Sequence, residues 1–517
     1  MLLPLACAAF AAELVLPPIS SIPATVLSAP PSEIEAGAFS ERQASSRATL
    51  VTELEAVALW SSKNRAYLER DKTYELILEF EESNKAARSA LKYIRDSKTK
   101  EWIRPRPYRQ PKNAAPEAAI ESAAKRQTVL EAHVERMVSA VEACATMLET
   151  GIKNKALGAL LPYAPDNEHL RMSLGQVRFS VGGGSDRWVS KDSAATLKRR
   201  AELASWRASA RAMVPELKTT DLQTEEASLG DTLSWTYALQ SGSLRLLSTG
   251  NESEARNLLT DMQVMRAYMP KVLGGQYGPV EDANIYLLPT SGSSTDFRDK
   301  FPFVSQANRS AWGGQVGTFL GTTPHCAIYA SSPDLRRDIT LRLATSLYLV
   351  RNYGIRAHKR GWVVEGFGLY LVHQIAGTRL SFTRGSDPKE APRSGSKSRR
   401  NANNPLGSPD ADWLANALAS IQSGELPKLA FVLGKSAEAM TPNDAVVANA
   451  LAAYLIEALG PEVTEQVLTR IGGQWKDGKQ IKAGEASALV LEDVFGLPLK
   501  EIYPTIARWV TEISSNE

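Results

Sequence analysis

The most distinctive stretch of this 517-residue chain is Trp362-Val363-Val364-Glu365-Gly366-Phe367-Gly368-Leu369-Tyr370. It sets one carboxylate, that of Glu365, in an otherwise apolar run at the start of a predicted helix over residues 362–376. Another helix is predicted over residues 334–352, and 18 residues separate Glu365 from its segment Arg342-Leu343-Ala344-Thr345-Ser346. A carboxylate in an apolar helix needs a polar or charged partner.

These two segments resemble the metal-binding helices of gluzincin-type zinc peptidases. The stretch around Glu365 is similar to the W-x-x-E-G-x-A-x-Y pattern of the secreted bacterial peptidase-MA-like families, in which an H-E-x-x-H helix precedes the glutamate, commonly by 18 intervening residues. The resemblance covers about residues 221–510, including Gly313–Gly317 and the closing helices with Phe495 and Trp509. It implies an α+β, mostly helical fold, with a zincin-like domain whose small mixed sheet packs on helices.

The same resemblance implies that the catalytic site has been lost. Active relatives hold zinc with two histidines and a glutamate, and a further glutamate acts as general base. The matching positions here are Arg342, Leu343 and Ser346. Arginine cannot coordinate zinc, leucine cannot carry a proton as a general base does, and serine is a poor zinc ligand. None of the five histidines precedes a glutamate, and no two lie within five residues of each other. We therefore expect no catalytic residues and no bound metal, only a vestigial site formed by Arg342, Leu343, Ser346 and Glu365.

Without zinc, Glu365 has two plausible environments. The guanidinium of Arg342 is long enough to reach the vacated metal position and pair with Glu365. Alternatively, Glu365 lies at a solvent-open helix start, where the helix dipole favours a carboxylate. A metal site with His358 and His373 is disfavoured, because Glu365 and His373 are two helical turns apart, about 12 Å along the axis. Solvated surface histidines are the simpler interpretation.

Composition and termini narrow the class of protein. Charged residues make up 23% and hydrophobic ones 43%, which is typical of globular proteins, and a net charge of +3 does not indicate nucleic-acid binding. No run of 18 apolar residues follows the N-terminus, so no transmembrane span is expected. Residues 1–12 resemble the second half of a secretory signal peptide, which predicts an exported, periplasmic or cell-envelope protein; a disordered apolar tail is the alternative. Cys144 and Cys326 can form a disulfide or stay as buried thiols.

The N-terminal part predicts a linker over residues 13–46 and a helical region over residues 47–219. Its segment 59–94 resembles a tetratricopeptide-type (TPR) helical hairpin. The tail of that segment recurs 83 residues later, with Asn84, Arg88 and Leu91 matched by Asn167, Arg171 and Leu174. This repetition predicts two related helical units separated by a long helix over residues 115–157, which Gly151 interrupts. A further helix over residues 192–213 is basic; its basic face is expected to be solvated, and binding of an anionic cell-envelope polymer is the alternative.

Residues 220–517 are predicted to form the degenerate peptidase-MA-like domain. Strands are predicted within residues 233–249, 283–290, 314–321 and 325–331, a helix over residues 252–272, and a low-complexity insertion over residues 383–409. The function predicted for the whole chain is that of a non-catalytic pseudo-metallopeptidase of the bacterial cell envelope. It would bind proteins or peptides through its TPR-like helices or the vestigial cleft. The alternatives are an active metallopeptidase or other hydrolase with a non-standard site, and a structural envelope protein whose cleft is filled.

Overall fold

A computed structural model describes residues 33–99, 101–104, 111–144, 148, 150–180, 186–230, 232–275, 277–278, 282–312, 317–320, 325–330, 332–377, 413–424, 427–473, 475–476, 479–480 and 486–514. The protein is mostly helical with small sheets, so the predicted α+β, mostly helical class is confirmed. It divides into two compact units, Met1–Arg178 and Phe179–Glu517. The predicted signal segment 1–12 and the predicted insertion 383–409 lie outside the described residues.

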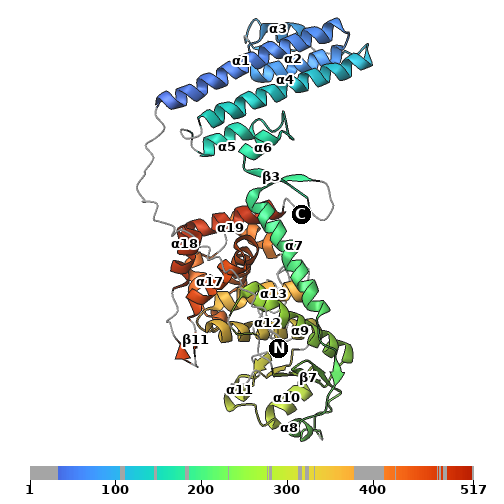
Figure 1. The fold of residues 1–517 in the computed structure, drawn as a ribbon, viewed down its shortest axis with the longest axis vertical. Helices are drawn as coiled ribbons and strands as arrows, with labels where there is room; N and C mark the ends of the chain where they lie inside the picture. The colour runs from blue at the N-terminus through green and yellow to red at the C-terminus, as the bar shows by residue number, and fades with distance from the viewer. Residues whose placement is uncertain are drawn as a thin grey trace, which may run out of the picture. The chain divides into compact units, whose positions relative to one another are not determined.

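The first unit is built on three long helices. Helices α1, α2 and α4 pack against one another (Figure 1). Its elements in chain order are α1 (Glu33–Lys63), α2 (Tyr67–Phe80), α3 (Lys85–Ala90), β1 (Ile94–Arg95), β2 (Trp102–Ile103), α4 (Pro116–Ala143), α5 (Thr150–Gly158) and α6 (Glu168–Ser173). Strand β3 (Gln176–Phe179) carries the chain into the second unit.

The predicted linker over residues 13–46 is wrong in its last part, because α1 already begins at Glu33. The residues after Pro31 are mostly Glu, Ala, Ser, Gln and Arg, which a helix accepts. Phe39 is buried in a cluster with Val134 and Met137 of α4. Burying this ring against α4 therefore extends α1 into a segment that composition alone assigned to the linker.

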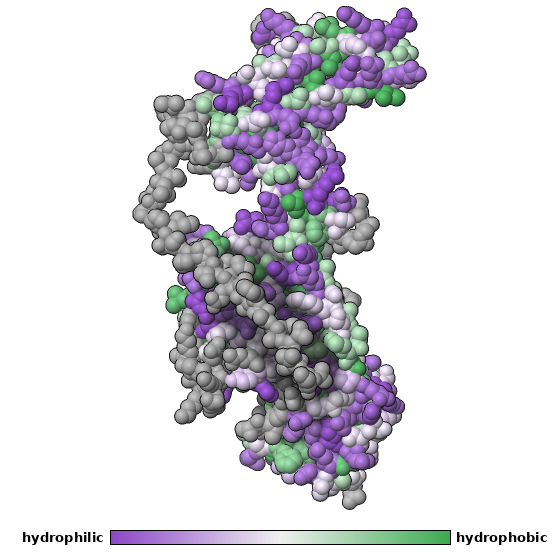
Figure 2. Space-filling view, in the orientation of Figure 1, coloured by the Kyte–Doolittle hydropathy of each residue, from purple (hydrophilic) through white to green (hydrophobic). Residues whose placement is uncertain are grey.

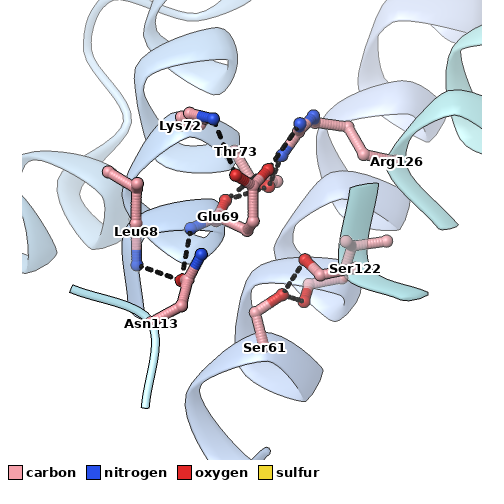
Figure 3. Close-up of polar contacts among 9 residues, drawn as sticks. Ser61, Leu68, Glu69, Lys72, Thr73, Asn113, Ser122 and Arg126 are labelled. Atoms are coloured by element: carbon pink, nitrogen blue, oxygen red, sulfur yellow. Dashed lines mark hydrogen bonds and ion pairs between the residues drawn. The ribbon is translucent and has the colours of Figure 1, made fainter. Parts of the chain in front are cut away.

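Polar side chains fix the three long helices to one another (Figure 3). The buried Glu69 of α2 accepts from Arg126 of α4 at 2.8 Å and from Lys72 at 2.7 Å, and these hydrogen bonds and charges outweigh burial to lower the pKa of Glu69. Asn113 accepts from the backbone N–H of Leu68 at 2.9 Å, so a residue distant in sequence caps the start of α2.

The predicted repeat is present as structure. Short helices α3 and α6 have Asn84 and Asn167 as N-caps, whose side chains accept from backbone N–H groups three residues on. In both copies the arginine four residues later donates Nε to a carbonyl six residues back, at 2.7 Å for Arg88 and 2.6 Å for Arg171. Each asparagine also donates to a glutamate of the preceding long helix, namely Glu55 of α1 or Glu135 of α4. The first unit therefore contains two copies of one helical motif.

The long helix predicted over residues 115–157 is two helices. α4 ends at Ala143, with Cys144 as its C-cap, and α5 starts at Thr150. Gly151 lies inside α5, so the interruption precedes it rather than coinciding with it. Cys144 belongs to the buried cluster beneath this junction, and packing of Leu157 and Leu160 on α4 explains why the chain changes direction there.

The second unit contains a six-stranded mixed sheet with the order β5-β6-β7-β8-β10-β9. β6 and β7 form an antiparallel hairpin, β7, β8 and β10 are parallel, and β9 pairs antiparallel with β10 at the edge. The strands are β5 (Lys218–Thr219), β6 (Tyr237–Ser241), β7 (Leu244–Ser248), β8 (Ala283–Leu287), β9 (Gly317–Phe319) and β10 (Cys326–Ile328). All four strand-bearing segments predicted from sequence are confirmed.

Both faces of this sheet are covered. On one face Leu246, Ile285 and Ile328 belong to the large core built with α9 (Glu252–Leu273), α12 (Pro333–Tyr353) and α13 (Gly361–Ala376). On the other face Leu247 and Tyr286 belong to a second cluster, under α8 (Thr224–Ala227), α10 (Ser291–Lys300) and α11 (Gln306–Ala311). Successive strand residues alternate between the two cores, as the period of two requires.

Helix α7 (Lys191–Ala212), which follows β4 (Arg187–Ser190), belongs to the second unit, although the sequence analysis placed residues up to 219 with the TPR-like region. Its Leu203 and Ala210 are part of the large core, and Ser190, its N-cap, donates to Glu512 at 2.8 Å. The prediction of a solvated basic face is wrong for most of its arginines. All four arginines bind acceptors of the same unit: Arg199 the Glu457 and Ala458 carbonyls, Arg200 the Glu457 carboxylate, Arg207 Gln374, and Arg211, which stays 49% exposed, Asp261.

The remaining described chain is mostly helical. Its elements are α14 (Trp413–Ser423), α15 (Leu429–Gly434), a 3₁₀ turn (Ala437–Ala439), α16 (Pro442–Ala453), a π-helical turn (Tyr454–Leu459), α17 (Pro461–Gly472), β11 (Trp475–Lys476), β12 (Lys479–Gln480), α18 (Ser487–Phe495) and α19 (Leu499–Ser514). Of these, α15, the following 3₁₀ turn and α16 pack against α13. Within the described residues, every helix is too short or too polar to cross a bilayer.

Candidate functional site

The vestigial site predicted from sequence lies where α12 and α13 pack together. Pro333 occupies the first turn of α12, where its missing N–H costs nothing, and Gly354 ends that helix in the left-handed conformation. The loop after Gly354 returns the chain so that α13 lies against α12 (Figure 1). The two helices predicted over residues 334–352 and 362–376 are confirmed within one residue at each end.

Helix α13 is buried around almost its entire circumference, as its apolar sequence demands. Two glycines let neighbouring backbone approach it. A Cβ at Gly361 would lie 2.5 Å from the Ser436 carbonyl carbon, and one at Gly366 would lie 2.7 Å from the Ala448 carbonyl carbon of α16. Glu365 is therefore carried into the core of the unit on a helix with no room to shift.

Arg342 and Glu365 form an ion pair, with a guanidinium nitrogen of Arg342 donating to Oε2 of Glu365. Their side chains are 10% and 4% exposed. The sequence hypothesis that Arg342 pairs with Glu365 is thus confirmed, and the alternative of a solvent-open Glu365 is wrong. Burial limits access of water to the pair, so removal of the Arg342 cation leaves the Glu365 carboxylate in an apolar environment.

The other two vestigial residues are half-buried beside this pair. Leu343 packs against the large core and lines an apolar cavity of about 40 Å³ with Phe319 of β9 and Tyr348. That volume is far below the several hundred Å³ of ordinary ligand pockets. Ser346 lies one turn after Arg342 on the same side of α12. Gly368 faces the Arg342 stem, since a Cβ there would lie 3.5 Å from Arg342 Nε. Within the described residues, the space that Leu343 lines is therefore too small for an ordinary ligand.

The histidines are dispersed. His133 shares a hydrogen bond of 3.0 Å with Ser46, and burial lowers the pKa of His133 to about 4. His325 accepts from the Asn284 N–H, while His358 is exposed and His373 half-buried. Among the described residues, no group of three His, Cys, Asp or Glu side chains is arranged to hold a metal ion. Cys144 and Cys326 are free and buried, and burial raises the pKa of Cys326 to about 12.

A second buried polar centre was not predicted from the sequence. Glu457, on the π-helical turn after α16, accepts from the Tyr370 hydroxyl at 3.0 Å and from Arg200 Nε at 2.7 Å. Burial, and secondarily the Glu457 charge, raises the pKa of Tyr370 well above its ordinary value. This centre joins α7, α13 and the π-helical turn. The basic composition of residues 192–213 was its only sequence signal, because the acceptor lies more than 200 residues away.

The first unit carries a groove that was also missed. Its volume is about 630 Å³, within the range of ligand sites. Two antiparallel helices line it with the same spacing, Glu53, Ala56, Val57 and Trp60 from α1 and Lys125, Thr128, Val129 and Ala132 from α4. The Lys125 ammonium lies 5.0 Å from the centre of the Trp60 ring. Figure 2 shows hydrophobic residues interspersed among hydrophilic ones over these helices. We call this feature the α1–α4 groove.

No protein-family model matches the chain, and neither a curated protein nor a solved structure matches it.

Proposed function

We propose that this protein is a non-catalytic, gluzincin-like pseudo-metallopeptidase of the bacterial cell envelope, exported by its N-terminal segment, that acts by binding a segment of another protein. The Arg342–Glu365 ion pair carries the non-catalytic part of the proposal. The resemblance assigns the first zinc-ligand position to Arg342 and the third to Glu365, and these two side chains touch. A cation already occupies the place of the metal, and it has no water to activate.

Restoring the metal ligands tests this assignment. The variant Arg342→His, Leu343→Glu, Ser346→His recreates H-E-x-x-H upstream of Glu365 and removes the cation that neutralises it. We expect it to bind about one equivalent of zinc per chain, because positions 342 and 346 share one helical face that meets Glu365. Metal analysis and zinc titration of both proteins measure this, with the native chain expected to bind none.

The control adds Glu365→Ala to the same variant and should weaken zinc binding at least about tenfold through loss of one ligand. A folded triple variant without zinc affinity would remove the support for a gluzincin-like site. Stoichiometric zinc in the native chain, together with hydrolysis of unfolded casein, would instead favour the alternative of an active hydrolase.

The α1–α4 groove supports the binding part of the proposal better than the vestigial site does. Residues at positions i, i+3, i+4 and i+7 form one ridge on each helix, and the space between two such ridges accepts a third helix. Ala56 and Ala132 are small, which lets that helix approach closely. The half-buried Trp60 and Val129 offer the apolar surface that it would bury. We therefore propose an amphipathic helical segment of a partner protein as the ligand.

A labelled, designed amphipathic helical peptide serves as the probe for this groove. We expect its fluorescence anisotropy to rise on binding the full chain. Ala132→Arg should weaken the affinity about tenfold or more, since the new side chain fills the groove. Ala124→Arg makes the same substitution at an exposed position of α4 outside the groove and should leave binding unchanged. Equal affinity for the two variants would contradict the assignment.

A further inference from the structure

The hairpin of β1 and β2 exposes aliphatic side chains to solvent. Ile94 and Ile103 are direct cross-strand partners, so they share one face, and they are 53% and 42% exposed. Trp102 is 39% exposed. Isoleucine side chains are usually buried. Two adjacent exposed isoleucines on a hairpin of two-residue strands therefore require an explanation.

The hairpin is held in place from behind. The Arg88 side chain, 6% exposed, lies 5.3 Å from the centre of the Tyr93 ring and 4.8 Å from that of Trp102. Its Nε donates to the Glu82 carbonyl at 2.7 Å. An isolated two-stranded hairpin is marginally stable, but these contacts fix this one on α3. The two isoleucines therefore face solvent from a hairpin whose position is fixed.

The same region concentrates positive charge. Between Lys85 and Lys112 the sequence holds ten Lys or Arg and only two acidic residues, a net charge of +8. Two of these cations, Arg88 and Arg104, pair with Glu82 and Glu75 outside this segment. The whole chain has a net charge of only +3, so the remainder is net negative. Lys92, Arg95 and Lys98, on and around the hairpin, are exposed. An apolar tip with exposed cations beside it is complementary to a surface with an apolar interior and an anionic face.

We propose that the β1–β2 hairpin docks the protein on an anionic phospholipid surface, with Ile94 and Ile103 entering the interface and the surrounding basic residues lying among the head groups. Nucleic acid fits less well, because aliphatic side chains do not stack on bases and one face of the Trp102 ring is already covered by Arg88. A folded protein partner also fits less well. Two isoleucines on a protruding hairpin offer far less than the roughly 800 Å² that each side of a stable interface buries.

Vesicle co-sedimentation of the full chain tests the proposal. We expect binding to vesicles of phosphatidylcholine with phosphatidylglycerol, weak binding to phosphatidylcholine alone, and release by high salt, because charges screened beyond a Debye length no longer attract. Ile94→Ser with Ile103→Ser should lower the partition coefficient about tenfold, and Lys98→Glu several-fold. Both sets of substitutions lie on exposed positions, so circular dichroism should be unchanged.

Matched controls distinguish binding through the hairpin from nonspecific adsorption to vesicles. Ile120→Ser removes an isoleucine that is 74% exposed on α4, and Lys155→Glu reverses an exposed charge on α5; neither should alter vesicle binding. Equal binding to neutral and anionic vesicles, or no binding to either, would overturn the proposal. So would binding of a single-stranded oligonucleotide in the absence of vesicle binding, which would assign the basic hairpin to nucleic acid. These outcomes are independent of zinc and of the α1–α4 groove.

Discussion

Replacing Gly366 with alanine is expected to destabilise the second unit by about 3 kcal/mol, the upper part of the range for overpacking. The added methyl would lie 2.7 Å from the carbonyl carbon of Ala448 and against its oxygen. These are backbone atoms of α16, so no rotamer change relieves the clash and the two helices must separate. The gain in helix propensity, about 1 kcal/mol, offsets only part of this cost. Urea unfolding followed by circular dichroism and tryptophan fluorescence measures the change.

Gly368→Ala is the matched control on the same buried helix. Its methyl would meet only the Arg342 side chain, at 3.5 Å and 3.6 Å, which is ordinary van der Waals contact. The variant should therefore be as stable as the native protein or up to about 1 kcal/mol more stable. Equal unfolding midpoints for the two alanine variants would show that α13 and α16 do not pack at the proximity described.

Periodicity and residue type were sufficient to predict most elements of the second unit. The alternation in residues 233–249 predicts β6 and β7, because side chains on one face of each strand belong to one core and those on the opposite face belong to the other. The Arg342–Glu365 pair was also predictable, since a buried carboxylate restricts its partner to a cation or a proton donor and the resemblance to gluzincin helices supplied the candidate. In these cases the information lies within one helix or strand, or in two that are adjacent in sequence.

The features missed are those that depend on distant segments. Nothing near Arg200 in the sequence indicates that its acceptor is Glu457, so its helix looked like a solvated basic face. The α1–α4 groove likewise depends on the antiparallel alignment of α1 and α4, which the Ser61–Ser122 and Glu53–Arg136 contacts fix. Each helix alone shows only an ordinary apolar stripe. The start of α1 was missed because Phe39 gains its stabilisation from α4.

Arg342→Met is expected to destabilise the second unit by about 3 kcal/mol, the cost of leaving a buried carboxylate without its cation. Glu365→Leu should cost less, because the flexible arginine stem can carry its charge toward solvent. If the ion pair has replaced a metal and adds no stability of its own, the double variant Arg342→Met, Glu365→Leu should have a free energy of unfolding within about 1 kcal/mol of that of the native protein. The reason is that apolar groups of similar volume replace a buried ion pair with little loss of stability. Denaturant unfolding of the four proteins gives a coupling energy.

A coupling energy near zero would contradict a buried, mutually dependent pair and with it the idea that Arg342 substitutes for the metal. Arg256→Met provides the comparison, since Arg256 pairs with Glu252 at 2.6 Å on an exposed turn of α9. Water solvates both groups of that pair already, so the unfolding midpoint should not change measurably. The two arginines differ chiefly in burial. A large effect at position 342 and none at position 256 would therefore attribute the loss of stability to the desolvated carboxylate of Glu365. A desolvated carboxylate needs a cation, whether that cation is a metal ion or a guanidinium.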